Sequence, residues 1–327
     1  MERRVIRMKG EGGPEVLQEE RSPLGDLAPG HVRVRVATSG VNRADLVQRL
    51  GRYPPPPGYP RDIPGLEFAG VVEALGEGCS RREPGDRVMG LVGGGGYAEL
   101  LDVPEEETIR VPGGVDLEQA GAIPEVFMTA WDALFRQARL QAGEQVLIHA
   151  IGSGVGTAAL QLVLAAGARP IGTSRTPEKV EKAGELGLVR GVVAQGDWEA
   201  AAGELAGESG VQVILDLVGA SYLEANLGLL GRHGRWIIVG VPGGSRGELD
   251  LRRLMALRAS IRGTVLRTRS SAEKVVLARA FEELVVPLFE EGRLRPVVDT
   301  ILPAGEATRA HERMEDSLNF GKILLRW

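Results

Sequence analysis

One short segment restricts the fold of this chain more than any other. The residues HAIGSGVG, at 149–156, stand directly between the buried run QVLIHA and the helical run VGTAALQLVLAAGA. The three glycines leave the backbone free to turn sharply and to approach a bound group closely. A helix that begins at such a turn presents free N–H groups and the positive end of its dipole, which suits a pyrophosphate. We therefore expect a phosphate cradle formed by Gly152, Ser153, Gly154, Val155 and Gly156.

The spacing of the three glycines departs from the strict GxGxxG pattern, so the segment alone is a weak signal. The prediction therefore depends on the strand before the segment and on the helix and second strand after it. The alternative is a closely packed helix start that binds nothing, although three glycines where alanine would fold better disfavour it. Further strands alternate with helices from about residue 124 to residue 266, as in RPIGTSR, TPEKVEKAGELG, GVVAQ, VQVILDLVG, SYLEANLGLLG and RWIIVGV. This alternation predicts an α/β domain with a doubly wound parallel sheet over residues 124–266.

The chain of 327 residues exceeds what one hydrophobic core usually organises, so we expect a second domain. In HVRVRV, valines alternate with arginines, and the runs EFAGVVEAL, DRVMGLV and YAELLDV follow between turns. These short strands predict a β-rich, closed or sandwiched antiparallel domain. Residues 267–327, which end in the strand KILLRW, come after the parallel-sheet domain is complete. We expect them to return to the first domain, which then comprises residues 1–123 and 267–327.

Composition excludes some classes of function. No apolar run of about 20 residues is present, so we expect no membrane span and a cytoplasmic protein without disulfides, since Cys79 is the only cysteine. One cysteine and four scattered histidines disfavour a zinc site, so we expect no bound metal. The net charge of -5 makes nucleic acid an unfavoured partner. The arginine-rich stretch 252–269 is interpreted as a solvated helix face followed by pocket-lining residues.

The end of the second strand of the parallel domain distinguishes between cofactors. An NAD site usually places a carboxylate about 20 residues after the glycines, where this chain has GTSR at 172–175. Ser174, Arg175 and Lys179 instead offer a hydroxyl and two cations to a 2′-phosphate. We therefore predict NADPH as the cofactor. The alternative is that Arg175 and Lys179 are ordinary solvated charges.

Nine motifs in one order resemble a known family: GVNRADLVQRLGRYPPPPG, IPGLEFAGVV, GDRVMGL, GGGGYAE, PEVFMTAWDAL, HAIGSGVGTAALQL, ILDLVG, GRWIIVG and NFGKILL. The chain resembles the zeta-crystallin-like quinone oxidoreductases of the medium-chain dehydrogenase/reductase type, and looks closest to their tumour-suppressor-inducible branch. Zinc-dependent relatives carry a metal-binding Cys and His where this chain has Asn42 and Leu66. The resemblance implies a GroES-like catalytic domain beside a Rossmann domain, with substrate and nicotinamide meeting in the cleft between them.

The resemblance also implies roles for individual residues. Asn42 and Tyr53 would line the nicotinamide and quinone pocket, and Thr129 would contact the cofactor. The residues that would close over the nicotinamide half are Gly240, Val241, Leu266, Arg267 and Asn319. The sequence departs from close relatives at Arg175, where a small residue is frequent, and after the third strand, where a frequent tyrosine is missing from GVVAQGD. These departures leave the adenine contacts as the weakest part of the likeness.

The implied reaction is hydride transfer from NADPH to a quinone without a metal. The developing oxyanion needs hydrogen-bond donors, which the phenol of Tyr53 and the amide of Asn42 can supply. Both residues also have structural interpretations: Asn42 can cap the following helix, and Tyr53 can pack against the proline run. Two other functions stay open, namely NADPH-dependent reduction of enones or enoyl thioesters, and a low-turnover protein that binds NADPH or RNA. The run ASIRGTVL predicts an open sheet edge, and with the resemblance a homodimer.

Overall fold

The computed structural model describes residues 1–327, which form two compact units. Unit 1 comprises Met1–Met128 and Leu266–Trp327, and unit 2 comprises Thr129–Val265. Each unit is built around its own sheet. The last 60 or so residues return to the unit that contains the N-terminus, because β15 (Lys322–Arg326) pairs antiparallel with β3 (His31–Val41).

Unit 2 contains a six-stranded parallel sheet with the order β10-β9-β8-β11-β12-β13. The strands are β8 (Gln145–Ile148), β9 (Arg169–Ser174), β10 (Gly191–Val193), β11 (Val211–Asp216), β12 (Leu230–Ile238) and β13 (Ser260–Gly263). Numbered along the chain, this is the 3-2-1-4-5-6 order of a Rossmann domain. The order reverses between β8 and β11, and a switch point of this kind is where dinucleotides bind in such folds.

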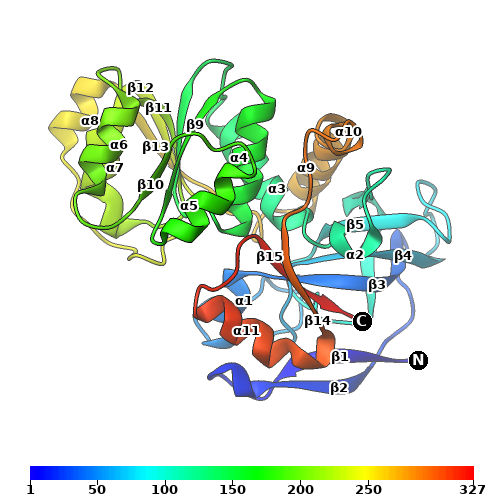
Figure 1. Cartoon of the computed structure of the whole chain (residues 1–327). Helices are drawn as coiled ribbons and strands as arrows, with labels where there is room; N and C mark the ends of the chain where they lie inside the picture. Colours follow the sequence, from blue (N-terminus) through cyan, green and yellow to red (C-terminus); the bar gives the residue numbers. More distant parts are fainter. The chain divides into compact units, whose positions relative to one another are not determined.

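Helices cover both faces of this sheet. Figure 1 shows α4 (Gly154–Ala165) and α5 (Pro177–Gly184) on one face, and α6 (Trp198–Ala206), α7 (Leu223–Leu229) and α8 (Leu251–Leu257) on the other. A short η4 turn (Ala220–Tyr222) precedes α7, and the η3 segment (Asp132–Gln137) is a π-helix. The hydrophobic core of unit 2 includes the fully buried side chains of Trp236, Ile214 and Leu147, and residues of α6 and α7 pack against them. The alternation expected from the sequence is therefore confirmed for this α/β part of the fold.

Unit 1 is built on a mostly antiparallel seven-stranded sheet. Its order is β14-β15-β3-β4-β5-β7, with β6 paired to β3 and only β14 and β15 parallel. The remaining strands are β4 (Glu67–Leu75), β5 (Arg87–Leu91), β6 (Leu100–Pro104), β7 (Thr108–Arg110) and β14 (Val298–Pro303). A separate two-stranded sheet is formed by β1 (Glu2–Met8) and β2 (Leu17–Pro23).

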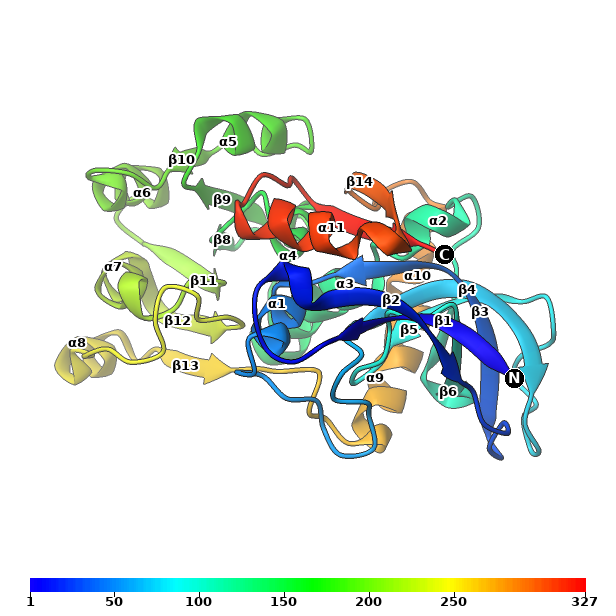
Figure 2. The ribbon, with the colours of Figure 1, turned by 90° about the horizontal axis from the view of Figure 1, so that it is seen from below.

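The helices of unit 1 come from three parts of the chain. They are α1 (Arg43–Arg49), α2 (Leu117–Ala120), α9 (Ser271–Leu284), α10 (Val286–Glu290) and α11 (Ala307–Glu315), together with most of α3 (Pro124–Trp131) and the short turns η1 (Pro14–Val16), η2 (Glu105–Glu107) and η5 (Ala304–Glu306). In Figure 2, α11 lies along β15 and along the segment that leads into β2. It contacts β15, η1 and β2. This packing places α11 over the sheet of unit 1.

The period-two pattern in β3 decides which face of that strand is buried. Val32, Val34 and Val36 are nearly inaccessible to solvent, whereas Arg33 and Arg35 point outward, as their alternation predicts. Arg33 pairs with Asp102 on the neighbouring β6, with Nε to Oδ1 at 2.8 Å. The buried valines join the core formed with β4, β15 and α11. No helix of the chain combines the length and apolar character that a bilayer crossing requires.

Candidate functional site

The glycine segment forms the connection from β8 to α4. Ser153 is the N-cap residue of α4, and its Oγ accepts a hydrogen bond from the Gly156 N–H at 3.0 Å. A Cβ on Gly156 would overlap the carbonyl oxygens of Ala150 and Ile151, so only glycine lets the helix start approach this turn. The turn thus leads directly into a helix start, as a pyrophosphate cradle requires, and the cradle itself remains a proposal.

The sharp turn itself is made by Ala150 rather than by the glycines. Ala150 has a φ of 48°, a left-handed conformation that is unfavourable for a residue with a Cβ. None of the glycines Gly152, Gly154 and Gly156 has a positive φ. Gly152 and Gly156 thus provide space rather than backbone freedom. This is a difference from the role that the sequence suggested for them.

A buried polar network holds the residues around this turn. His149 is fully buried, with Nδ1 2.8 Å from Thr173 Oγ1 and Nε2 2.6 Å from Asn226 Oδ1. Because the Asn226 amide nitrogen donates to Asp216, its oxygen is the acceptor for the Nε2–H of His149. Burial lowers the pKa of His149, so the ring is neutral. These contacts give His149 a structural role.

Asp216 completes the network at the end of β11. Its Oδ2 accepts from Asn226 Nδ2 at 3.1 Å and from Trp236 Nε1 at 3.0 Å, and its Oδ1 accepts from the N–H groups of Val218 and Gly219. The network thereby ties together the carboxyl ends of β8, β9 and β11 and the middle of β12. Fully satisfied networks of this kind make the surrounding backbone rigid.

The residues predicted to hold a 2′-phosphate lie at the end of β9 and the start of α5. Ser174 is the last residue of β9 and is buried, with its Oγ accepting from the Thr176 N–H at 3.3 Å. A Cβ on Gly152 would come within 2.8–3.1 Å of the Cδ, Cβ and Cγ atoms of Lys179, so the Lys179 stem lies directly against the glycine turn. Arg175 is exposed, and its charge lowers the pKa of the nearby Tyr222 against the larger effect of burial.

Two further predicted contacts lie at the end of β12, and one lies in α3. Gly240 is half-buried, and the following Val241 is exposed. Thr129 is a buried residue of α3. Each of the three remains a proposed cofactor contact.

In unit 1, a buried carboxylate organises the predicted pocket. Glu67, the first residue of β4, is fully buried, and its Oε1 accepts from Lys322 Nζ at 2.6 Å and from Asn42 Nδ2 at 2.8 Å. Its Oε2 accepts from the Glu125 backbone N–H at 2.8 Å. Lys322 Nζ also donates to Val41 O and Asn42 Oδ1, each at 2.7 Å, so all three of its protons are used. We call Glu67, Lys322, Asn42 and Glu125 the Glu67 cluster.

Asn42 occupies the N-cap position of α1, but its side chain is held by this cluster. The amide nitrogen donates to Glu67 and also to Gly40 O at 3.3 Å, and the oxygen accepts from Lys322. Both amide hydrogens are therefore engaged inside the protein. This arrangement fits a residue that fixes the pocket wall better than one that donates to a reacting oxygen.

A second chain of hydrogen bonds continues from α1 toward α11. Asp45 is buried and accepts from the Asn42 N–H at 2.8 Å and from the Tyr97 hydroxyl at 3.1 Å. Tyr97 is also 3.1 Å from His311 Nε2, and His311 Nδ1 is 3.2 Å from Arg49 NH1. Burial raises the pKa of Asp45 to about 6, and burial together with Arg49 lowers the pKa of His311 to about 3. His311 is therefore neutral, and Arg49 pairs with Glu315.

Tyr53 is fixed from one side by Arg267. The Arg267 guanidinium lies 4.8 Å from the centre of the Tyr53 ring, which is a cation–π contact. Its Nε donates to Gly93 O at 2.7 Å, its NH1 to Tyr53 O at 3.0 Å and its NH2 to Gln48 Oε1. Burial raises the pKa of Tyr53, so the phenol is protonated at neutral pH. Arg267 therefore positions Tyr53, and its predicted contact with the cofactor remains a proposal.

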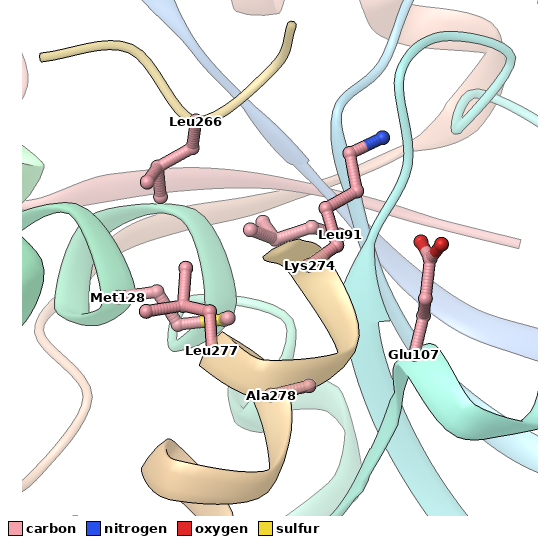
Figure 3. Close-up of a pocket in the computed structure, with 7 residues that line it drawn as sticks. All are labelled: Leu91, Glu107, Met128, Leu266, Lys274, Leu277 and Ala278. Carbon is pink, nitrogen blue, oxygen red and sulfur yellow. The ribbon is translucent and has the colours of Figure 1, made fainter. Parts of the chain in front are cut away.

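Leu266 and Asn319 are buried in unit 1. Figure 3 shows the apolar ends of Leu266, Met128 and Leu277 converging on a cavity of about 10 Å³, while the Lys274 ammonium points away from them. This volume holds one water molecule and no larger ligand. Asn319 donates from Nδ2 to Gly321 O at 2.8 Å, immediately before the strand that carries Lys322. Both residues remain proposed contacts of the nicotinamide half.

The sequence interpretation missed several residues that the fold brings to this site. Glu67, Lys322, Glu125 and Asp45 were not singled out, because only their tertiary neighbours distinguish them from surface charges. One signal was available, since all four lie within or beside apolar runs in which a charge needs a partner. No group of three or more His, Cys, Asp or Glu side chains is arranged to hold a metal ion. The expectation that the protein binds no metal stays a prediction.

We predict that Gly156→Ala weakens NADPH binding by about tenfold or more, because the new methyl group forces the helix start away from the turn that would hold the pyrophosphate. Isothermal titration calorimetry of the purified variant measures the change. Gly184→Ala is the matched control, since a Cβ at that place in α5 meets nothing within 4 Å. Equal affinity of the wild type and Gly156→Ala would contradict the assignment of the cradle.

Comparison with known proteins places the whole chain in one family. A family model described as zinc-binding dehydrogenase matches residues 154–282, and one described as alcohol dehydrogenase GroES-like domain matches residues 28–113. A quinone oxidoreductase from Lama guanicoe is 33% identical over 326 residues, covering 98% of this chain and 97% of that protein.

Solved structures agree. One described as an NAD-dependent alcohol dehydrogenase has 30% identity and a TM-score of 0.89, and covers 99% of each chain. The enoyl reductase CurK, with 24% identity and a TM-score of 0.87 over 99% of each chain, shares the fold. The chain therefore belongs to the zeta-crystallin-like quinone oxidoreductase family of medium-chain dehydrogenases/reductases, and it is an oxidoreductase with a GroES-like and a Rossmann domain.

Proposed function

We propose that this oxidoreductase reduces quinones with NADPH, without a metal. The observation that carries the proposal is the position of Lys179 against the glycine turn, next to a β9 end that has Ser174 where NAD sites have a carboxylate. A bound dihydronicotinamide supplies a hydride. The residues of this chain would grip its phosphates and stabilise the oxygen that becomes negative on the acceptor.

The two units would contribute different parts of this chemistry. In unit 2, the residues at 152–156 would hold the pyrophosphate, and Ser174, Arg175 and Lys179 would hold the 2′-phosphate. In unit 1, Tyr53 would donate a hydrogen bond to the quinone oxygen, since its hydroxyl makes no hydrogen bond within the chain and stays protonated. Asn42 would keep the wall of this pocket in place through the Glu67 cluster. We propose residues 124–266 as the dinucleotide-binding domain.

The alternative acceptor is a carbon–carbon double bond conjugated to a carbonyl. The same hydride donor and the same oxyanion donors serve both reactions. The likeness to CurK concerns the fold alone at its level of identity, whereas the quinone oxidoreductase from Lama guanicoe is more similar in sequence. This difference favours the quinone.

We expect NADPH to exceed NADH in kcat/KM by well over tenfold, because the cations at the end of β9 stabilise a phosphate that NADH lacks. Lys179→Ala should raise the KM for NADPH about tenfold and leave the KM for NADH nearly unchanged. Lys182→Ala, one turn further along α5, is the control and should change neither value. Equal use of the two cofactors by the wild type would overturn the assignment.

The acceptor is tested by steady-state rates. Naphthoquinone and phenanthrenequinone should be reduced faster than crotonyl thioesters and alkenals. Tyr53→Phe should lower kcat with quinone by about tenfold or more while NADPH still binds, because the variant loses the oxyanion donor. Asn42→Ala should also lower kcat, since it removes a hydrogen-bond partner of Glu67 and Lys322. Unchanged turnover in both variants would refute these roles, and faster reduction of the thioesters would select the alternative acceptor.

We also propose a homodimer in which the sheet of unit 2 continues across two subunits. The strand β13 forms one edge of that sheet, and an exposed edge offers unpaired N–H and C=O groups to a second chain. Light scattering coupled to size exclusion should give about twice the monomer mass at micromolar concentration. The Thr264 N–H bonds to Ile238 O on β12, so the alternate N–H of Gly263 points to the open edge, and Gly263→Pro, which removes that donor, should shift the protein toward monomer. A monomeric wild type would contradict the proposal.

A further inference from the structure

Glu125 is an acid whose carboxyl group has no partner in the protein. It is the second residue of α3, and its backbone N–H is fixed by Glu67 Oε2 at 2.8 Å. Its side chain is half-buried, yet its carboxyl oxygens make no hydrogen bond or ion pair within the chain. Because no group of the chain occupies these oxygens, they are available to a bound molecule or for proton transfer.

The charges around Glu125 favour its protonated form. Glu67 on β4 and Asp45 on α1 face it with negative charge, whereas Lys322 on β15 and Arg267 face it with positive charge. The ammonium of Lys322 is already bound by three acceptors, and the guanidinium of Arg267 by three others. Burial, followed by the charge of Glu67, raises the pKa of Glu125 to about 8. The group therefore carries a proton at pH 7.

Glu125 also lies near the proposed acceptor site. Its charge acts on both Tyr53 and Arg267, which places it within the same group of side chains. The other candidates for a proton donor are poor acids. The amide hydrogens of Asn42 are held by Glu67 and Gly40, and the pKa of Tyr53 is raised above its ordinary value. Tyr53 can stabilise an oxyanion without giving up its proton.

We propose that Glu125 is the acid that supplies the proton completing the reduction, an inference that rests on the proposed function. Two electrons and one hydrogen pass to the quinone as a hydride and leave a hydroquinone monoanion. The O–H bond of Glu125 then breaks, its proton forms the second O–H bond of the hydroquinone, and Glu125 is left as a carboxylate. Water returns a proton to Glu125. A phenol has a pKa of about 10, so the proton moves from a stronger acid, Glu125, to the phenolate oxygen of the hydroquinone, which is downhill.

The test uses the full-length protein and three variants. Glu125→Gln removes the acid with little change in shape, Glu125→Asp keeps an acid, and Glu83→Gln replaces an exposed glutamate of the same unit as the control. For the wild type and Glu83→Gln, kcat/KM for naphthoquinone should be constant at low pH and fall above about pH 8, where Glu125 loses its proton. Glu125→Gln should be slower by about a hundredfold and lose this limb of the profile, while Glu125→Asp should recover part of the rate and the limb.

A second measurement does not depend on turnover. Infrared difference spectra between the wild type and Glu125→Gln should show a protonated carboxyl band at pH 7 that disappears with a midpoint near pH 8. The affinity for NADPH, measured by calorimetry, should be equal in both. A wild-type rate and pH profile in Glu125→Gln, or the absence of the band, would overturn the role of Glu125. A wild type that reduces no quinone and no enone would instead refute the proposed function.

Discussion

The buried carboxylate of Glu67 is the point on which the pocket of unit 1 depends. A carboxylate with no exposure to water is stable only when its charge is paired and its oxygens accept hydrogen bonds. Lys322, Asn42 and the backbone of Glu125 meet that requirement from three separate segments of the chain. Gly40 belongs to the same arrangement, because a Cβ there would overlap the Glu67 carboxyl group. This pairing fixes Asn42 and the start of α3, whereas Tyr53 is held separately by Arg267.

Unit 2 uses a hydrogen-bond network around the buried Asp216 for a similar purpose. His149, Asn226, Asp216 and Trp236 satisfy one another beneath the glycine turn, where β8 and β11 mark the reversal of strand order. The strained conformation of Ala150 is maintained because its neighbour His149 is anchored on both ring nitrogens. Rigid support of this kind is what a backbone cradle needs, since it must offer its N–H groups without rearranging.

The two units also differ in how they treat charge. Unit 2 places Arg175, which is exposed, directly after β9 and Lys179 in the following helix α5. Unit 1 places Lys322 and Arg267 inside the protein, where each donates three hydrogen bonds to acceptors of the same unit. Membership of the quinone oxidoreductase family is consistent with this division, because a dinucleotide brings its own charge and a quinone acquires charge only during the reaction.

The sequence by itself determined the features that depend on local spacing: the parallel-sheet domain, the glycine turn before α4 and the absence of a carboxylate at the end of β9. Hydrophobic periodicity and turn residues involve neighbouring positions in the chain, so the sequence predicts their effects without a structure. Only the tertiary structure decided that Lys322 meets Glu67, 255 residues away, and that Arg267 fixes Tyr53. Such contacts arise because a buried charge must find a partner wherever the fold brings one, and no local pattern specifies which residue that will be.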